Sequence, residues 1–318
     1  MTFKRNSTAT KLASFAGLLV LVFAGAAFAG SRIDPSVDDG PAHGGETESM
    51  AMDSHGDEAA HGSNETTATL PGLSVADGGY VLEVKHTDVP AGQPVDLDFA
   101  ITTDDGRNVK EFDLTHERRM HLILVRRDFQ GFQHLHPDQD ADGSWSVKTA
   151  PLSPGTYRMF ADFSVGGESL TLASDLFVTG EFEPEPLAPV SRTADAGDGY
   201  EVEIESPAAA GGETVPAEFT VSHDGRPVDE VEPYLGADGH LVALREGDQA
   251  FLHTHPEGEP GGSGPIRFQV EYPTAGRYRL YLQFRHDGEV HTAEFTRIAG
   301  ESRADQEIHA ESHEGGDH

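Results

Sequence analysis

The chain has 318 residues, no cysteine, and 55 acidic against 22 basic side chains, which gives a formal net charge of −33. This charge argues against binding to nucleic acid or to anionic lipid, which both require basic surface, and it is typical of a highly soluble protein or of a high-salt habitat. The absence of cysteine excludes thiolate metal sites, thiol catalysis, disulfides and a lipoprotein anchor.

The first residues have the pattern of an export signal. Three basic residues precede an apolar stretch at residues 12–26, and Ala27-Phe28-Ala29 forms a small-x-small cleavage site. We predict a signal peptide over residues 1–29 and an exported, periplasmic or extracellular, protein. If the segment stays uncleaved, it would anchor the chain in a membrane.

Two polar tails flank the body of the chain. Residues 30–71 and 301–318 are rich in Gly, Ser, acids and His and contain few branched apolar residues, so we expect both to be disordered. Short histidine-rich tracts with thioethers suit transition metals, so we expect both tails to collect metal with low affinity. The residues concerned are His43, Met50, Met52, His55, His61, His309, His313 and His318.

The body consists of short apolar runs of strand type, separated by Gly, Pro and Asp turns, with no sustained helical period. The same features recur about 120 residues later; Gly79-Tyr80, for example, matches Gly199-Tyr200. We predict an all-β fold of two tandem immunoglobulin-like β-sandwich domains, residues 72–180 and 198–300, joined by a semi-rigid Pro-rich linker at residues 181–197.

A second repeated feature supports the sandwich. In "LSPGTYRMF" and "YPTAGRYRL" a Gly stands two residues before a Tyr that opens an apolar strand. This arrangement is typical of a tyrosine corner, in which the hydroxyl bonds the backbone a few residues upstream. We therefore expect Tyr157 and Tyr278 to make this contact.

The most distinctive repeat contains histidines. "HLILVRRDFQGFQHLHP" runs from His121 to Pro137, and "HLVALREGDQAFLHTHP" runs from His240 to Pro256. If Val125 pairs with Phe132 in a hairpin, position 123 faces 134 and position 121 faces 136, so the histidines of each phrase share one face. Three imidazoles on a rigid sheet suit Zn(II) or Cu(II). The two candidate ligand sets are His121, His134 and His136, and His240, His253 and His255.

A further hairpin occurs only in the second copy. In "FRHDGEVHTAEF" the Asp287-Gly288 pair predicts a two-residue turn that places position 286 opposite 289 and position 284 opposite 291. His286 and His291 would then lie on one face, beside Glu289. Because the first copy has apolar residues at the matching places, we expect the second domain to hold the better metal site.

The histidines have two other interpretations. They can be structural, hydrogen-bonded to backbone and neighbours without any metal. The stretch "HERRMH" resembles the zinc-protease helix H-E-x-x-H, but its second histidine is one residue too far and leads into a strand. We expect His116 and Glu117 only as outer partners of the histidine group.

The paired histidine phrases, with "GTYRMFADF" and "GRYRLYLQFRHDG", resemble YtkA-like domains and, more distantly, the β-sandwich of CopC-type copper-resistance proteins, over residues 75–298. The resemblance implies a secreted bacterial protein associated with copper or other heavy metals. The copper ligands of CopC-type proteins are not matched in this chain.

These observations give three functional hypotheses. The first is an exported protein that binds copper or zinc and buffers or delivers it outside the cytoplasm, with a metal-transport or redox protein as its partner. The second is a non-catalytic interaction module, at the cell surface or in the periplasm, whose histidines are structural. The third is a metalloenzyme with an open coordination position; we expect no enzyme, because the chain shows no catalytic motif.

Overall fold

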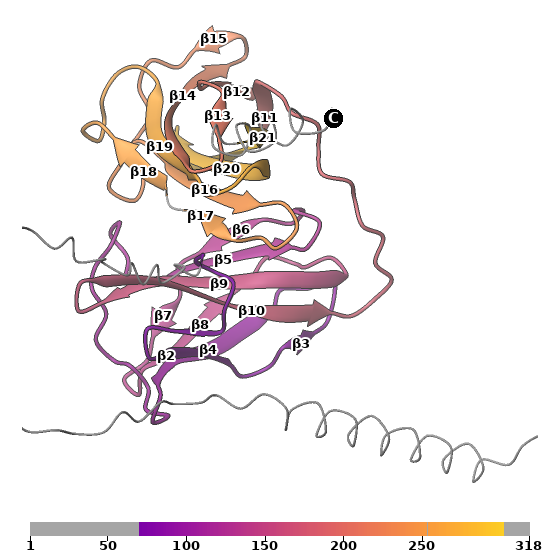
Figure 1. Ribbon diagram of the computed structural model, residues 1–318, viewed down its shortest axis with the longest axis vertical. Helices are drawn as coiled ribbons and strands as arrows, with labels where there is room; N and C mark the ends of the chain where they lie inside the picture. The colour runs from indigo at the N-terminus through magenta and orange to yellow at the C-terminus, as the bar shows by residue number, and fades with distance from the viewer. Residues whose placement is uncertain (1–69, 253, 302–318) are drawn as a thin grey trace, which may run out of the picture. The chain divides into compact units, whose positions relative to one another are not determined.

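The computed structural model describes residues 70–252 and 254–301, and the ordered elements are all strands (Figure 1). The expected signal segment, nearly all of the first tail, His253 and the second tail beyond residue 301 lie outside the described residues. No helix that is long and apolar enough to cross a membrane is present among the described residues.

The first domain is a sandwich of two five-stranded sheets. One sheet has the strand order β1 (Ala76–Asp77), β2 (Tyr80–Val84), β4 (Asp96–Thr103), β8 (Ser144–Lys148), β7 (Asp138–Gln139). The other has the order β3 (Asp88–Val89), β10 (Glu168–Val178), β9 (Gly155–Val165), β5 (His121–Arg126), β6 (Gln133–Leu135).

The second domain repeats this arrangement strand for strand. One sheet contains β11 (Thr193–Gly197), β12 (Tyr200–Glu205), β14 (Glu213–His223), β19 (Ile266–Tyr272) and β18 (Thr254–Glu257), with β15 (Arg226–Pro227) paired to β14. The other contains β13 (Ala209–Ala210), β21 (Glu289–Gly300), β20 (Gly276–His286), β16 (His240–Arg245) and β17 (Phe251–Leu252). The predicted fold of two tandem immunoglobulin-like sandwiches is confirmed.

Both tyrosine corners are present. The Tyr157 hydroxyl accepts a hydrogen bond from the Ser153 N–H at 3.2 Å, and the Tyr278 hydroxyl donates to the Thr274 carbonyl at 2.6 Å. Each tyrosine is buried and bonds the backbone four residues upstream. Each corner therefore fixes the start of a long strand, β9 or β20, beside which the histidine-bearing strand lies.

Strands β5 and β16 bury side chains on both faces, which is why their sequences are continuous apolar runs rather than alternating ones. Leu122 and Leu124 of β5 belong to the core of the first sandwich. Ile123 and Val125, on the opposite face, belong to a third apolar cluster that also contains residues of the second domain. Strand β16 divides in the same way, with Leu241 and Ala243 in its own core and Val242 and Leu244 in the shared cluster.

The shared cluster has an approximate two-fold character. Phe132 stacks on Tyr281 with ring centroids 4.2 Å apart, and Phe251 contacts Phe160 at 5.5 Å. Phe251 is the repeat counterpart of Phe132, because it follows His240 at the same spacing as Phe132 follows His121. Tyr281 is the counterpart of Phe160, because the two occupy matching places in β20 and β9. The Tyr281 hydroxyl also donates to the Phe129 carbonyl at 2.7 Å. The two copies thus contact each other through equivalent positions, as in an isologous interface.

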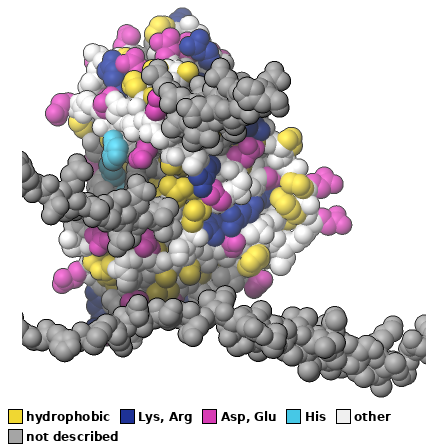
Figure 2. Space-filling view, in the orientation of Figure 1, with side chains coloured by type: hydrophobic (Ala, Val, Ile, Leu, Met, Phe, Trp, Pro, Cys, Tyr) yellow, Lys and Arg dark blue, Asp and Glu magenta, His cyan; other side chains and the backbone are white. Residues whose placement is uncertain are grey.

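Acidic side chains are spread over the face of the molecule seen in Figure 2, with basic ones among them. Several arginines are held in ion pairs: Arg126 with Asp128 at 2.8 Å, which is buried, and Arg127 and Arg158 with Asp175 at 2.8 and 3.1 Å. The charge of these basic side chains is therefore partly neutralised by neighbouring carboxylates.

Candidate metal centre

The register of the first histidine hairpin is the predicted one. Ile123 of β5 pairs with His134 of β6. Opposed residues point to the same side of an antiparallel pair, and so do residues two apart in one strand. His121 and His134 therefore lie on the same face as Ile123, which is the face turned toward the second domain.

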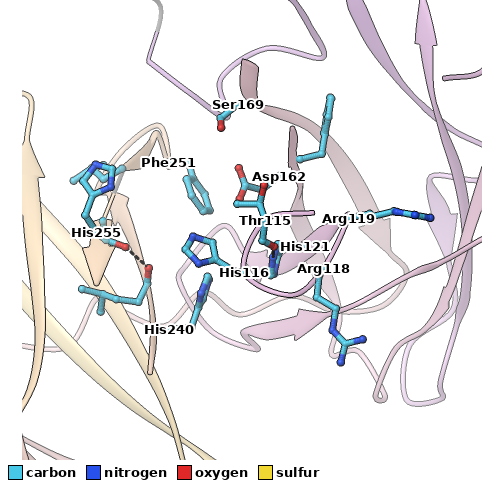
Figure 3. Close-up of a pocket in the computed structure, with 14 residues that line it drawn as sticks. Thr115, His116, Arg118, Arg119, His121, Asp162, Ser169, His240, Phe251 and His255 are labelled. Atoms are coloured by element: carbon cyan, nitrogen blue, oxygen red, sulfur yellow. Dashed lines mark hydrogen bonds between the residues drawn. The ribbon is translucent and has the colours of Figure 1, made fainter. Parts of the chain in front are cut away.

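The corresponding face of the second domain brings His240 to the same place. His240 begins β16, two residues before Val242 of the shared cluster. One ring nitrogen from each of His121, His134 and His240 lies within 4.8 Å of the others. Figure 3 shows His240 from one domain and His116 and His121 from the other converging on one another. The histidine group thus lies between the two domains.

Five imidazole rings are packed in this group. His121 and His240 are stacked, with centroids 5.5 Å apart and an interplanar angle of 7°, and His134 lies 4.6 Å from His240. His136 lies 5.2 Å from His121 and 4.8 Å from His134, and its buried Nε2 has no hydrogen-bond partner among the described residues. His116 lies about equally far from two rings, 6.1 Å from His121 and 5.9 Å from His240.

The hydrogen bonds of two of these rings are unusual. Nδ1 of His121 faces Nε2 of His134 at 3.0 Å. The other nitrogen of each ring faces a carbonyl oxygen: His121 Nε2 lies 3.1 Å from the Thr115 carbonyl, and His134 Nδ1 lies 2.7 Å from Oε1 of Gln283. A neutral imidazole has one N–H, so when both rings donate to these oxygens, both facing nitrogens present lone pairs to each other. A cation between them would satisfy both.

The facing pair could also hold a metal ion in place of a shared proton. Ligand bonds of about 2.0–2.1 Å at tetrahedral angles hold two nitrogens about 3.4 Å apart, close to the separation of the facing pair. Metal-bound histidines commonly donate their second N–H to a carbonyl, which here would be Thr115 for one ring and Gln283 for the other. His240 would provide the third nitrogen, from the opposite domain.

The electrostatics of the group keep the rings neutral. Burial lowers the pKa of His121 to about 4, and burial together with the neighbouring His121 and His136 lowers the pKa of His134 to about 3. The pKa of His136 is lowered to about 4 and that of His240 falls well below its ordinary value, in both cases mainly through burial. Neutral imidazole is the form that binds metal, so at neutral pH a metal ion would not have to compete with protons for these rings.

A strained turn places His116 beside the group. The backbone groups of Thr115 and Arg118 bond each other at 2.8 and 3.0 Å, and the two residues between them, His116 and Glu117, have φ values of 48° and 63°. Left-handed φ values are unfavourable for residues other than Gly, and a pair of them is the signature of a type I′ turn, which prefers Asn-Gly. The matching turn of the second domain has Gly236 at the second position, with φ 78°.

The second H-x-H-P phrase diverges from the first. β16 and β17 pair in the expected register, with Ala243 opposite Leu252. The chain then passes to the other sheet, where His255 lies in β18 opposite Gln269 and is exposed. His253 lies outside the described residues. The described structure brings His121, His134 and His136 together with His240, and His255 lines a pocket beside this group.

The second hairpin has the predicted register, but its two histidines lie in a different part of the second domain from His240. Phe284 pairs with His291, and His286 pairs with Glu289. Both histidines contact Tyr200: Nδ1 of His286 lies 2.7 Å from its hydroxyl, and the His291 ring lies 4.0 Å from its ring. Among the described residues, their ring contacts are with aromatic side chains of the second domain, away from His240. They do not join the three-histidine group.

A pocket of about 230 Å³ adjoins the group (Figure 3). Its walls include His116, His121 and His240, together with Asp162 and Phe251. Asp162 pairs with His121 across β5 and β9, and one of its oxygens accepts a hydrogen bond from Thr171 at 2.8 Å. Burial raises the pKa of Asp162 to about 6. Sequence reasoning did not single out Asp162 or Gln283, since neither lies in a histidine phrase; they occupy matching places opposite His121 and His240.

Comparison with known proteins identifies the family of this chain. Solved structures similar to this chain include the Escherichia coli adhesin FdeC (13% identity, TM-score 0.25, 70% of this chain and 65% of that one) and the titin Ig tandem domains A164–A165 (13%, TM-score 0.19, 70% and 97%). The match thus spans slightly less than two thirds of FdeC. A search of curated proteins found no match. One family model, described as domain of unknown function DUF8832, matches residues 74–180 and again residues 193–301, so the chain belongs to this family and carries its domain twice.

Proposed function

We propose that this protein binds one copper or zinc ion between its two sandwich domains and buffers or delivers it outside the cytoplasm. The observation that carries the proposal is the contact of His121 with His134, in which two ring nitrogens face each other at 3.0 Å while the other nitrogen of each ring faces a carbonyl oxygen. His240 adds a third nitrogen. Export rests on the predicted signal segment, and delivery would require a metal-transport or redox protein as partner.

The type of ligand indicates the type of metal. Three neutral imidazoles, without thiolates, suit Cu(II) and Zn(II), whereas Ca(II) and Mg(II) take oxygen ligands. Cu(II) exceeds Zn(II) in the general order of affinity, so we expect copper to displace zinc from an isolated set of this kind. The tails would add weak sites of lower affinity.

Titration of the full, metal-free chain tests the proposal. We expect equilibrium dialysis against Zn(II) or Cu(II) to give one tight equivalent, and His134→Ala and His240→Ala each to remove that equivalent while leaving weak binding by the tails. His286→Ala is the matched control, because it removes a histidine that contacts Tyr200 and lies outside the three-histidine group and the pocket beside it. A tight equivalent that survives His134→Ala and His240→Ala together would refute the assignment.

A second candidate function is an interaction module, at the surface or in the periplasm, with structural histidines. It is supported by the packing of the group against the shared apolar cluster and by the Gln283 side chain, whose amide could be turned over. Its nitrogen would then donate to His134, and a chain of neutral hydrogen bonds would run from Thr292 to Thr115 without an ion. This function predicts a melting temperature unaffected by chelators and by added Zn(II).

A further inference from the structure

We propose that the pocket beside the three-histidine site holds an exchangeable ligand of the metal ion, a water molecule that a small monodentate donor can replace, and that Asp162 faces this ligand. The inference rests on the proposed function, because it concerns the fourth coordination position of the same ion. It adds that the site is open rather than closed by protein.

The position of the pocket supports an open site. Two of the three candidate ligands, His121 and His240, line the pocket, whereas His134 does not line it and bonds Gln283. A tetrahedral ion held by these three nitrogens would therefore direct its remaining position toward the pocket. The pocket volume of about 230 Å³ is enough for several water molecules, at about 30 Å³ each, or for a small donor.

Asp162 is the acidic side chain best placed to act on such a ligand. It stands opposite His121 in the ladder between β5 and β9, so the two side chains leave the sheet on the same side. Figure 3 shows its carboxylate at the pocket, between Thr115 and Phe251. One oxygen accepts the hydrogen bond of Thr171, which leaves the second able to accept from a coordinated water molecule.

The approximate two-fold symmetry gives Asp162 a counterpart in the second domain that carries no charge. Its counterpart in the second domain is Gln283, which stands opposite His240 and contacts the His134 ring. The duplicated positions thus differ in charge: a neutral amide lies behind one ligand, and a carboxylate lies at the open side. A divalent ion held by three neutral rings keeps its full charge in a largely buried site. A carboxylate at the open side lowers the free energy required to bury this charge.

Residues at the mouth make the pocket reachable from solvent. His116 and Ser169 are exposed and line it, and Figure 3 shows the Ser169 hydroxyl directed toward its interior. His116 makes ring contacts but no hydrogen bond among the described residues, so its nitrogens remain able to form a hydrogen bond with a small ligand that enters the pocket. A bulky side chain at position 169 would narrow the entrance without touching the three ligands.

The test uses the full chain loaded with Co(II), whose visible spectrum reports coordination. We expect azide and imidazole to change the spectrum of the wild type, and Ser169→Trp to weaken both responses at least about tenfold with the Co(II) stoichiometry unchanged. Asp162→Asn keeps the shape and the Thr171 contact but removes the charge, so it should tighten azide at least about fivefold without tightening neutral imidazole. Asp96→Asn, an exposed position on β4, is the charge control and should change neither.

The outcomes separate the two proposals. If Co(II) does not bind to the wild type, the metal site itself is refuted. If Co(II) binds and His134→Ala removes it, but azide and imidazole leave the spectrum unchanged, the site is closed and the present inference is refuted while the proposed function stands. An azide affinity that rises equally in Asp162→Asn and Asp96→Asn would refute the role of Asp162.

Discussion

The metal-free protein should lose stability as the pH falls from 7 to 5, because His121 is buried in its neutral form. The pKa of His121 is lowered to about 4 in the folded chain, against about 6.5 in the unfolded chain. Between these values the unfolded chain binds more protons, so the free energy of unfolding rises with pH and is lost on acidification. For His121 alone the loss from pH 7 to pH 5 is about 2 kcal/mol.

One group opposes this effect. Burial raises the pKa of Asp162 to about 6, so the folded chain takes up a proton there above the pH at which the unfolded chain does. This contributes about 1 kcal/mol of stability on going from pH 7 to pH 5, with the opposite sign to His121. Asp162→Asn removes the opposing contribution and is therefore the proper background for the measurement.

The assay is urea unfolding at pH 7, 6 and 5 in the presence of a chelator. We expect Asp162→Asn to lose more stability on acidification than the wild type, and the double variant with His121→Gln to lose about 2 kcal/mol less than Asp162→Asn alone. The comparison uses the change in the free energy of unfolding with pH, so the pH-independent destabilisation caused by losing the His121 hydrogen bonds cancels. Equal slopes in the presence and absence of His121 would refute the claim that its ring is held neutral by burial.

Three further outcomes follow from the described contacts. Tyr281→Phe leaves the buried Phe129 carbonyl without its 2.7 Å donor and should lower the free energy of unfolding by about 1–3 kcal/mol in urea titrations, whereas exposed Ser169→Ala should change it little. Glu117→Gly removes the strain of a φ of 63° and should raise the melting temperature, with a gain of about 1 kcal/mol in the free energy of unfolding. Glu111→Gly, which lies outside the turn, should not raise the melting temperature. Zn(II) at a hundredfold excess over its dissociation constant should stabilise the wild type by about 2.7 kcal/mol and His240→Ala hardly at all, as measured by calorimetry.

Most of the fold was predictable because its determinants are local. The Asp287-Gly288 turn sets its hairpin register through two residues, and the Gly before Tyr157 and Tyr278 marks both tyrosine corners. The hairpin pairing of Ile123 with His134 follows from alternation along two adjacent strands. None of these features depends on how one domain meets the other.

The composition of the three-histidine group was not predictable in the same way, because it depends on which faces of two domains meet. The sequence held one signal: "HLILV" and "HLVAL" are uninterrupted apolar runs, and a strand of this kind is buried on both faces. That pattern indicates a second packing partner for the histidine-bearing face but does not name it. No local signal shows that the chain after Leu252 crosses to the other sheet, where His255 lies in β18.

The symmetry of the contact explains why a duplicated motif would give one site rather than two. In a two-fold contact, a residue near the axis meets its own counterpart, and His121 stacks on His240 in this way at 5.5 Å. The ligands therefore come from both copies, with His121 and His134 from the first and His240 from the second. Neither domain alone offers all three nitrogens, so the ion would bind tightly only when the two sandwiches are in contact. Weakening the shared cluster, as in Tyr281→Phe, should then lower metal affinity although the substituted side chain lies outside the three-histidine group.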